Sequence, residues 1–178
     1  MDCLERIVDG CEEAVASIDP RCREVLLDSI LSSRKVFIYG SGRSGLIGQL
    51  FAVRLVQLGL DVHFVGEMTT PIIGKEDLNI LISNTGRTSS VVQTATIDRR
   101  IGSKVISITG TAGSDLTRNS DVSIVMKVPS GEELQKAAPL GTIFEDSALL
   151  FFECVVSDLM ARTGNTEEDM RNRHAIWV

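Results

Sequence analysis

Two amphipathic helices are predicted at the start of the chain. Apolar residues recur with a 3.6-residue period over residues 4–18, and Asp2 and Glu5 have the spacing of a capping box. Asp19-Pro20 then supplies an N-cap and a first-turn proline for a second helix, which we expect to reach about Ile30. Both helices precede the first strand-like run.

Short apolar runs then alternate with amphipathic segments of helix length. The expected strands are 36–39, 62–65, 78–82, 105–109 and 122–128, and the expected helices are 44–58 and 89–101. Continuously apolar strands are typical of a parallel sheet covered on both faces. The pattern predicts an α/β fold, a three-layer α-β-α sandwich with a five-stranded parallel sheet, preceded by the two N-terminal helices.

The last third of the chain is predicted to be a loop followed by two helices. Residues 131–141 are polar and contain a proline, and their length is typical of a functional or flexible loop. A long helix is expected over 142–162, and Asn165-Thr166-Glu167-Glu168 caps a last short helix. With 178 residues and no linker or repeat, we expect one domain spanning 1–178.

Two glycine- and hydroxyl-rich turns follow the first and third expected strands. They read Gly40-Ser41-Gly42-Arg43-Ser44-Gly45 and Ser83-Asn84-Thr85-Gly86-Arg87-Thr88. Free backbone N–H groups and hydroxyls at a strand-to-helix turn form a cradle for an anion such as a phosphate monoester. Parallel strands bring both turns to the carboxyl edge of the sheet, where ligands bind in such folds. Alternatively, these residues are ordinary turn formers and helix caps.

The first turn also satisfies the G-x-G-x-x-G fingerprint of dinucleotide-binding folds, with Glu67 as the acid that would hold the ribose. A dehydrogenase needs a substrate domain, and 178 residues leave almost no chain for one. The hydroxyls of Ser83, Thr85 and Thr88 would also have no particular use. A nucleotide-binding oxidoreductase is therefore a lesser alternative.

Composition narrows the range of partners. A net charge of −6 and a pI near 5.0 argue against nucleic acid, which needs clustered Lys and Arg. The four cysteines form no C-x-x-C pair, so neither a zinc site nor a disulfide framework is expected, and a reducing cytoplasm is indicated. No apolar stretch has the length of a membrane span, so we expect a cytoplasmic protein without a membrane partner.

The two turns, together with three further segments, resemble the 6-phospho-3-hexuloisomerases of the SIS (sugar isomerase) domain family. The further segments are Val65-Gly66-Glu67 with Thr69-Thr70-Pro71, Pro139-Leu140-Gly141-Thr142-Ile143-Phe144-Glu145, and Arg173-His174. The resemblance implies a flavodoxin-like sheet, a homotetramer with active sites between subunits, and no metal or cofactor. It also implies interconversion of a 3-hexulose 6-phosphate and fructose 6-phosphate, in the ribulose monophosphate pathway of carbohydrate metabolism.

The same resemblance implies roles for individual residues. Glu145 is the expected base, and His174 is expected to serve the site of a neighbouring subunit. The expected phosphate-binding residues are Ser41, Ser83, Asn84, Thr85 and Thr88, and weaker candidates for substrate binding are Gly42, Arg43 and Glu67. The family's second turn usually has glycine where this chain has Asn84. Asparagine adopts the backbone angles of glycine less freely, so we expect a constrained backbone there.

The residues also make chemical sense for an isomerase. Moving a carbonyl between adjacent carbons requires a base that carries a proton through an enediolate. Glu145 lies among Leu140, Ile143 and Phe144, which are expected to desolvate it and raise its pKa. Alternatively, Glu145 is a first-turn acid favoured by the helix dipole. Arg43 is expected to contact phosphate or a sugar hydroxyl, or to pair with an acid.

Two further expectations concern function and assembly. A non-catalytic SIS domain that senses a sugar phosphate is the main alternative to an isomerase, and another ketose or aldose phosphate isomerase is less favoured. The opening helix and the 142–162 helix carry more apolar residues than one side of the sheet needs, including Phe151, Phe152, Val155 and Val156. We expect these to offer a surface for oligomer contacts.

Overall fold

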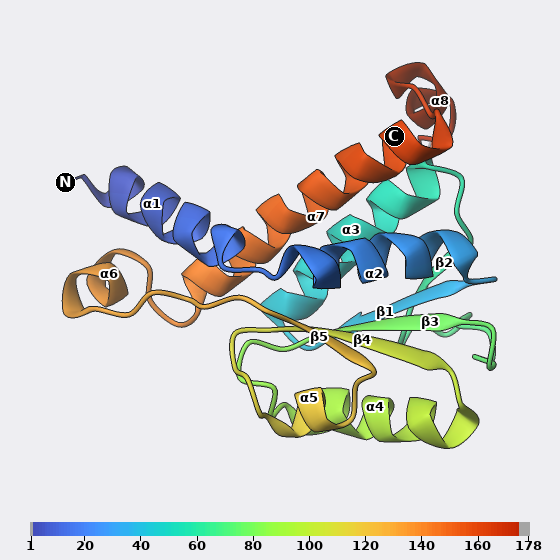
Figure 1. The fold of residues 1–178 in the computed structure, drawn as a ribbon, viewed down its shortest axis with the longest axis horizontal. Helices are drawn as coiled ribbons and strands as arrows, with labels where there is room; N and C mark the ends of the chain where they lie inside the picture. Colours follow the sequence, from blue (N-terminus) through green and yellow to red (C-terminus); the bar gives the residue numbers. More distant parts are fainter. Residues whose placement is uncertain (1, 175–178) are drawn as a thin grey trace.

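The computed structural model, which describes residues 2–174, has a five-stranded parallel sheet at its centre (Figure 1). The strands are β1 (Val36–Gly40), β2 (Val62–Phe64), β3 (Leu78–Ile82), β4 (Lys104–Thr109) and β5 (Val122–Val125). Their order in the sheet is β2-β1-β3-β4-β5, the flavodoxin-like order. The predicted parallel sheet is confirmed, although β5 ends at Val125 rather than at residue 128.

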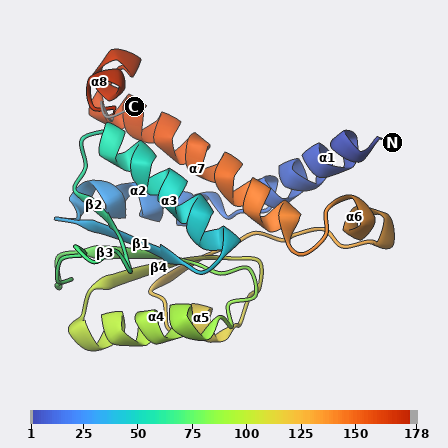
Figure 2. The ribbon, with the colours of Figure 1, turned by 180° about the vertical axis from the view of Figure 1, so that it is seen from behind.

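Helices cover both faces of the sheet, as Figures 1 and 2 show from opposite sides. One face carries α2 (Pro20–Ser32), α3 (Arg43–Gln57) and α7 (Thr142–Thr163), and the other carries α4 (Ser89–Ile101) and α5 (Asp115–Arg118). The larger apolar cluster lies under α2, α3 and α7. A smaller cluster, centred on Leu81, Val91 and Val105, lies under α4 and α5. The predicted three-layer α-β-α sandwich is confirmed.

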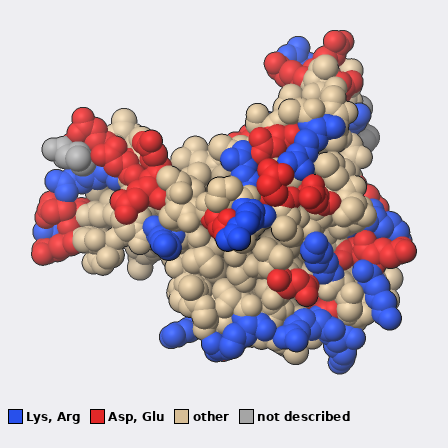
Figure 3. Space-filling view, viewed as in Figure 1, with Lys and Arg blue, Asp and Glu red and all other residues tan. Residues whose placement is uncertain are grey.

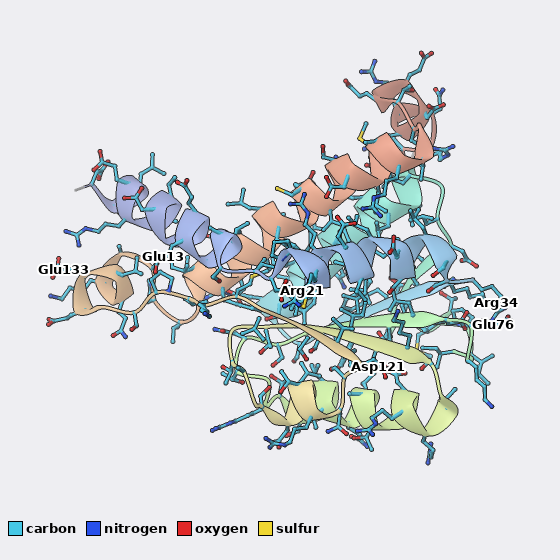
Figure 4. The ribbon with its side chains drawn as sticks, in the orientation of Figure 1. Glu13, Arg21, Arg34, Glu76, Asp121 and Glu133 are labelled. Carbon is cyan, nitrogen blue, oxygen red and sulfur yellow. The ribbon has the colours of Figure 1, made fainter. Side chains whose placement is uncertain are left out.

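Helix α1 (Cys3–Ala16) and helix α6 (Glu132–Ala137) extend beyond the sheet and pack near the start of α7 (Figure 1). We call this pair the α1–α6 arm. Its small core consists of Cys11, Ala14, Ala138 and Ile143. An ion pair between Arg6 and Glu133, 3.6 Å apart, links the two helices, and Figure 4 shows Glu133 on α6. The capping box predicted for Asp2 and Glu5 is present.

The expected loop over 131–141 was wrong in part, because it contains α6. Lys136 lies 2.9 Å from Glu132 and 3.0 Å from Glu133, and such pairs three and four residues apart stabilise a short helix. The short helix α5 was not predicted either. It begins after Ser114, whose side chain accepts a hydrogen bond from the backbone N–H of Thr117.

The long helix α7 is buried within the subunit rather than open for assembly. Phe151, Phe152, Val155 and Val156 are at most 1% exposed, and the Phe152 ring stacks on Phe51 of α3 at 4.1 Å. The predicted apolar surface of this helix is therefore wrong for those four residues. The exposed apolar side chains of the central helices lie mainly on α3: Leu46, Leu50, Val53 and Val56.

The end of the described chain packs on the far end of this layer. Helix α8 (Glu167–Asn172) has a capping box between Thr166 and Asp169, and Arg173 donates to the backbone oxygen of Gln57 at 3.1 Å.

Over residues 2–174, no helix is long and apolar enough to cross a membrane. In Figure 3, Lys and Arg side chains line the edge formed by α4 and α5.

Candidate functional site

The first turn connects β1 to α3 by a close approach of the backbone to itself. A Cβ on Gly45 would lie 2.6 Å from the backbone oxygen of Gly40, so only glycine fits at position 45. Gly42 has φ +59° and precedes the first residue of α3. These glycines therefore aim the N-terminus of α3 and its first residue, Arg43, at the carboxyl edge of the sheet.

The second turn presents hydroxyls at the same edge. Gly40 and Ile82 are register partners in β1 and β3, so Ser41 and Ser83 follow neighbouring strand ends. The Ser83 and Thr88 hydroxyl oxygens are 2.9 Å apart, and the Thr85 hydroxyl accepts from the backbone N–H of Arg87 at 3.3 Å. Ser83 is buried, Thr88 is partly buried and Thr85 is exposed. This arrangement suits an anion that approaches from solvent.

The backbone constraint expected at Asn84 is absent. Within residues 2–174, the only residue other than glycine with a positive φ is Leu140, at 56°. The second turn takes its positive φ at Gly86 instead, where a Cβ would also collide with the side chain of Ser114. Asn84 therefore replaces the family's glycine without backbone strain, and the expectation was wrong because the left-handed position is two residues further on.

Glu145 and Arg43 form an ion pair at this edge. Arg43 begins α3, Glu145 lies in the first turn of α7, and a guanidinium nitrogen of Arg43 contacts a carboxylate oxygen of Glu145. The Glu145 side chain is 13% exposed and that of Arg43 is 48% exposed. The Glu145 carboxylate is thus enclosed, whereas the guanidinium of Arg43 is about half exposed to solvent.

Burial raises the pKa of Glu145, as the sequence predicted, and the charge of Asp146 adds slightly to this effect. Hydrogen bonding and attraction to Arg43 act in the opposite direction, but the net change is upward. Phe144, next to Glu145, is fully buried, and Ile143 is 3% exposed. Leu140 was also expected to shield Glu145 from water, but it is 91% exposed and does not do so.

Glu67 and His174 lie elsewhere. Both line a hollow of about 760 Å³ beside α3, together with Arg173, Val53 and Phe64. The part of α7 from Glu145 to Thr163 spans about 27 Å, and His174 follows beyond that end. One chain therefore does not bring His174 to Glu145. Glu67 is exposed, and the carboxylate that pairs with Arg43 is Glu145.

Three threonines of the site were not predicted. The Thr142 hydroxyl lies 3.5 Å from a guanidinium nitrogen of Arg43 and donates to the backbone oxygen of Pro139 at 2.6 Å. The hydroxyls of Thr109 and Thr111 donate to the backbone oxygen of Asn84, at 3.1 and 3.2 Å. Thr109 ends β4, which lies next to β3, so the rule that ligand sites form at strand ends would have found it.

Over residues 2–174, no three His, Cys, Asp or Glu side chains are grouped so that they could hold a metal ion. The groups that the site does offer are hydroxyls, backbone N–H groups, one carboxylate and one guanidinium. This set fits a phosphorylated polyol that must exchange protons.

The family model of the SIS domain matches residues 29–150, from the end of α2 to the middle of α7. The chain belongs to the SIS domain family. This SIS domain is 41% identical to a 3-hexulose-6-phosphate isomerase of Methanocaldococcus jannaschii, over 84% of this chain and 80% of that one. It is 34% identical to the 3-hexulose-6-phosphate isomerase of Bacillus subtilis, over 97% of this chain and 95% of that one.

A solved structure agrees with these relatives. A hypothetical protein from Methanococcus jannaschii, for which a molecular function of 3-hexulose-6-phosphate isomerase was inferred, superposes with a TM-score of 0.89. It is 35% identical to this SIS domain, over 98% of both chains. The family and the fold expected from the two turns and the Pro139–Glu145 segment are confirmed.

Proposed function

We propose that this SIS domain interconverts a 3-hexulose 6-phosphate and fructose 6-phosphate through an enediolate. Its enzyme class is that of the sugar-phosphate isomerases, in line with relatives that carry the name 3-hexulose-6-phosphate isomerase over most of the chain. The observation that carries the proposal is the enclosed Glu145 carboxylate, paired with Arg43 beside a hydroxyl-lined turn.

The phosphate sits on the second turn. Ser83, Thr85 and Thr88 offer hydroxyls, and the backbone N–H groups of the turn and of the start of α4 add donors. Ser41 and Gly42 border the same position from the first turn, because Gly40 and Ile82 are register partners. The carbon chain of the sugar then extends toward Glu145.

Glu145 carries the proton between adjacent carbons. It takes the proton from C3 of fructose 6-phosphate, so the C3–H bond breaks and an enediolate forms across C2 and C3. Returning the proton to C2 forms the C2–H bond, and the hydroxyl proton passes from O3 to O2. The carbonyl moves from C2 to C3 without net oxidation. A carboxyl whose pKa is raised by burial is closer to neutrality and suits both halves of this transfer.

Arg43 stabilises the negative charge of the enediolate. It begins α3, and Glu145 lies in the first turn of α7, so the N-termini of two helices meet where charge develops. Since Arg43 is half exposed, it can move from the Glu145 carboxylate to the substrate oxygens. That exchange frees Glu145 to act as a base once the sugar is bound.

The complete site requires a second subunit in this proposal. His174 lies beyond the end of α7, about 27 Å along the helix from Glu145, so it serves the site of a neighbour in a homotetramer. The apolar side chains of Leu46, Leu50 and Val53 leave one face of α3 exposed for such contacts. We also propose that residues 1–178 form a single domain that acts in the cytoplasm, in the ribulose monophosphate pathway.

Solvent exchange tests the proposal directly. Purified protein incubated with fructose 6-phosphate in deuterated water is expected to incorporate deuterium at C3 and to form the 3-ketose, both visible by NMR. Calorimetric binding of fructose 6-phosphate without exchange or product would instead identify a sensor domain. Light scattering that gives a monomer would contradict the shared site.

A further inference from the structure

The Asn84 side chain lines a cavity beside the second turn (residues 83–88), which we call the phosphate turn. The cavity has a volume of about 510 Å³ and is bounded by Asn84, by residues 128–130 and by the segment from Leu134 to Ile143. Its lining is mixed, with the amides of Asn84 and Gln135 among apolar groups such as Val128 and Leu134. A polyhydroxylated carbon chain presents the same mixture of C–H surface and hydroxyls.

The backbone of Asn84 is held firmly at this place. Its carbonyl oxygen accepts from the backbone N–H of Gly110 at 3.0 Å and from the hydroxyls of Thr109 and Thr111. Three donors on one carbonyl fix the residue to the end of β4. The side chain therefore starts from a rigid position, which is what a recognition group needs.

The side-chain amide is wedged between two glycines. A Cβ on Gly110 would lie 2.4 Å from the Asn84 amide oxygen, and a Cβ on Gly141 would lie 2.9 Å from the amide nitrogen. Gly141 is the N-cap of α7, and its carbonyl oxygen accepts from the backbone N–H of Glu145 at 3.2 Å. The amide thus lies between the phosphate turn and the helix that carries the base.

Within residues 2–174, the Asn84 side chain forms no hydrogen bond, although it is partly buried and held in place. A partly buried amide without a partner is costly unless water or a ligand satisfies it. Its place on the cavity wall points to a ligand hydroxyl.

We infer that Asn84 is the specificity-determining residue of the site, whose amide hydrogen-bonds a hydroxyl of the open-chain ketose phosphate in this cavity. The inference rests on the proposed function and deepens it. A site built to hydrogen-bond a hydroxyl rejects analogues that lack it, because the protein group is then left unpaired. The glycine usual at this position in the family has no side chain to make that contact.

The test compares hydroxyl-deleted substrates in the wild type and in Asn84→Ala. Deuterium exchange at C3 gives kcat/KM for fructose 6-phosphate and for its 1-deoxy, 4-deoxy and 5-deoxy analogues. In the wild type, at least one deletion is expected to lower kcat/KM by about tenfold or more. In Asn84→Ala, the loss for that analogue is expected to shrink below about threefold, because the partner of the missing hydroxyl has been removed.

The outcomes separate this inference from the proposed function. Absence of C3 exchange by the wild type refutes the isomerase itself. If the wild type catalyses exchange but the ratios of kcat/KM between the analogues are the same in Asn84→Ala, the proposed role of Asn84 is wrong. A residue with a structural role only would change kcat/KM by the same factor for every substrate. Thr85→Ala is the matched control and is expected to lower kcat/KM by one common factor. If Asn84→Ala does not fold, as judged by thermal melting, Asn84→Gly is measured in its place and judged by the same ratios.

Discussion

Two carboxyl groups are withdrawn from water at opposite edges of the sheet. Glu145 lies at the carboxyl edge on α7, and Asp98 lies near the end of α4, against Asn79 of β3. Burial is the largest cause of a raised pKa in both, and it raises the pKa of Asp98 to about 6. By desolvation alone, either group could be taken for a catalytic acid or base.

Their surroundings set them apart. Glu145 lies in the first turn of its helix, where N–H groups favour a negative charge, and it faces the guanidinium of Arg43. Asp98 lies in the last turn of its helix, where carbonyl groups disfavour a negative charge, and its partners are neutral, the amide of Asn79 at 2.7 Å and the hydroxyl of Ser103. Asp98 is 1% exposed, so no substrate reaches it. A raised pKa is therefore common to both carboxyl groups, and what sets Glu145 apart is its access to solvent and its pairing with a partly exposed cation.

The largest expected effect comes from replacing each of the two carboxyl groups in turn. Glu145→Gln is expected to lower kcat by roughly a thousandfold, because the amide cannot take the proton from C3. Binding of fructose 6-phosphate, measured by calorimetry, should change little. Asp98→Asn is the matched control, a buried carboxyl converted to an amide, and should keep its activity within about twofold. Equal losses in the two variants would show that burial, not the site, explains the effect.

Removal of the cation is expected to have the next largest effect. Arg43→Ala should lower kcat/KM by about a hundredfold, because the enediolate loses its nearest positive charge. Arg43 also holds down the pKa of Glu145 against the effect of burial. Without it the pKa of Glu145 rises further, so the limb of the pH–kcat/KM profile that reports the ionised base should move to higher pH.

The control for Arg43→Ala is Arg21→Ala. Arg21 is an exposed arginine paired with Asp19 at 2.8 Å at the start of α2, and Figure 4 labels it. Its removal should leave both the rate and the pH profile unchanged. A profile that keeps its position in Arg43→Ala would mean that the ion pair does not tune the base.

Much of the fold follows from local signals in the sequence. All five residues of β3 are buried, as its unbroken apolar run predicts, and Asp2 with Glu5 caps α1 through contacts three residues apart. Orientation is harder to predict. Helix α7 has apolar residues on all sides, so the pattern could not tell that Phe151 and Phe152 face the core.

The candidate site was predicted in its parts but not in its pairings. The apolar neighbours of Glu145 in the chain predict that burial raises its pKa, and this direction is confirmed. The partner of Arg43 stayed open among phosphate, sugar and acid, since it depends on how α3 and α7 meet in space. The position of the Asn84 amide could not be predicted either, because Gly110 and Gly141, which flank it, come from two other segments of the chain.

The smallest expected effect concerns the stability of the protein and tests Asp98. The pKa of Asp98 rises from 3.8 to about 6 on folding, so the folded state binds the extra proton between these values. Its contribution to the free energy of unfolding therefore falls as pH rises from about 4 to 6, and ionised Asp98 is a cost above that window. Asp98→Asn should remove this cost and stabilise the protein at pH 7.5 by about 1 to 2 kcal/mol.

Local chemistry favours that gain. In the described chain, the amide oxygen of Asn79 has no hydrogen-bond partner, and an amide at position 98 can donate to it as well as accept from Asn79. Urea unfolding at pH 4.5 and 7.5 measures the difference, which should grow with pH, whereas Asp9→Asn on the exposed face of α1 should show no such trend. A destabilised Asp98→Asn at pH 7.5 would mean that the ionised carboxylate is stabilised by its neighbours, and the contrast with Glu145 would then rest on access to the substrate alone.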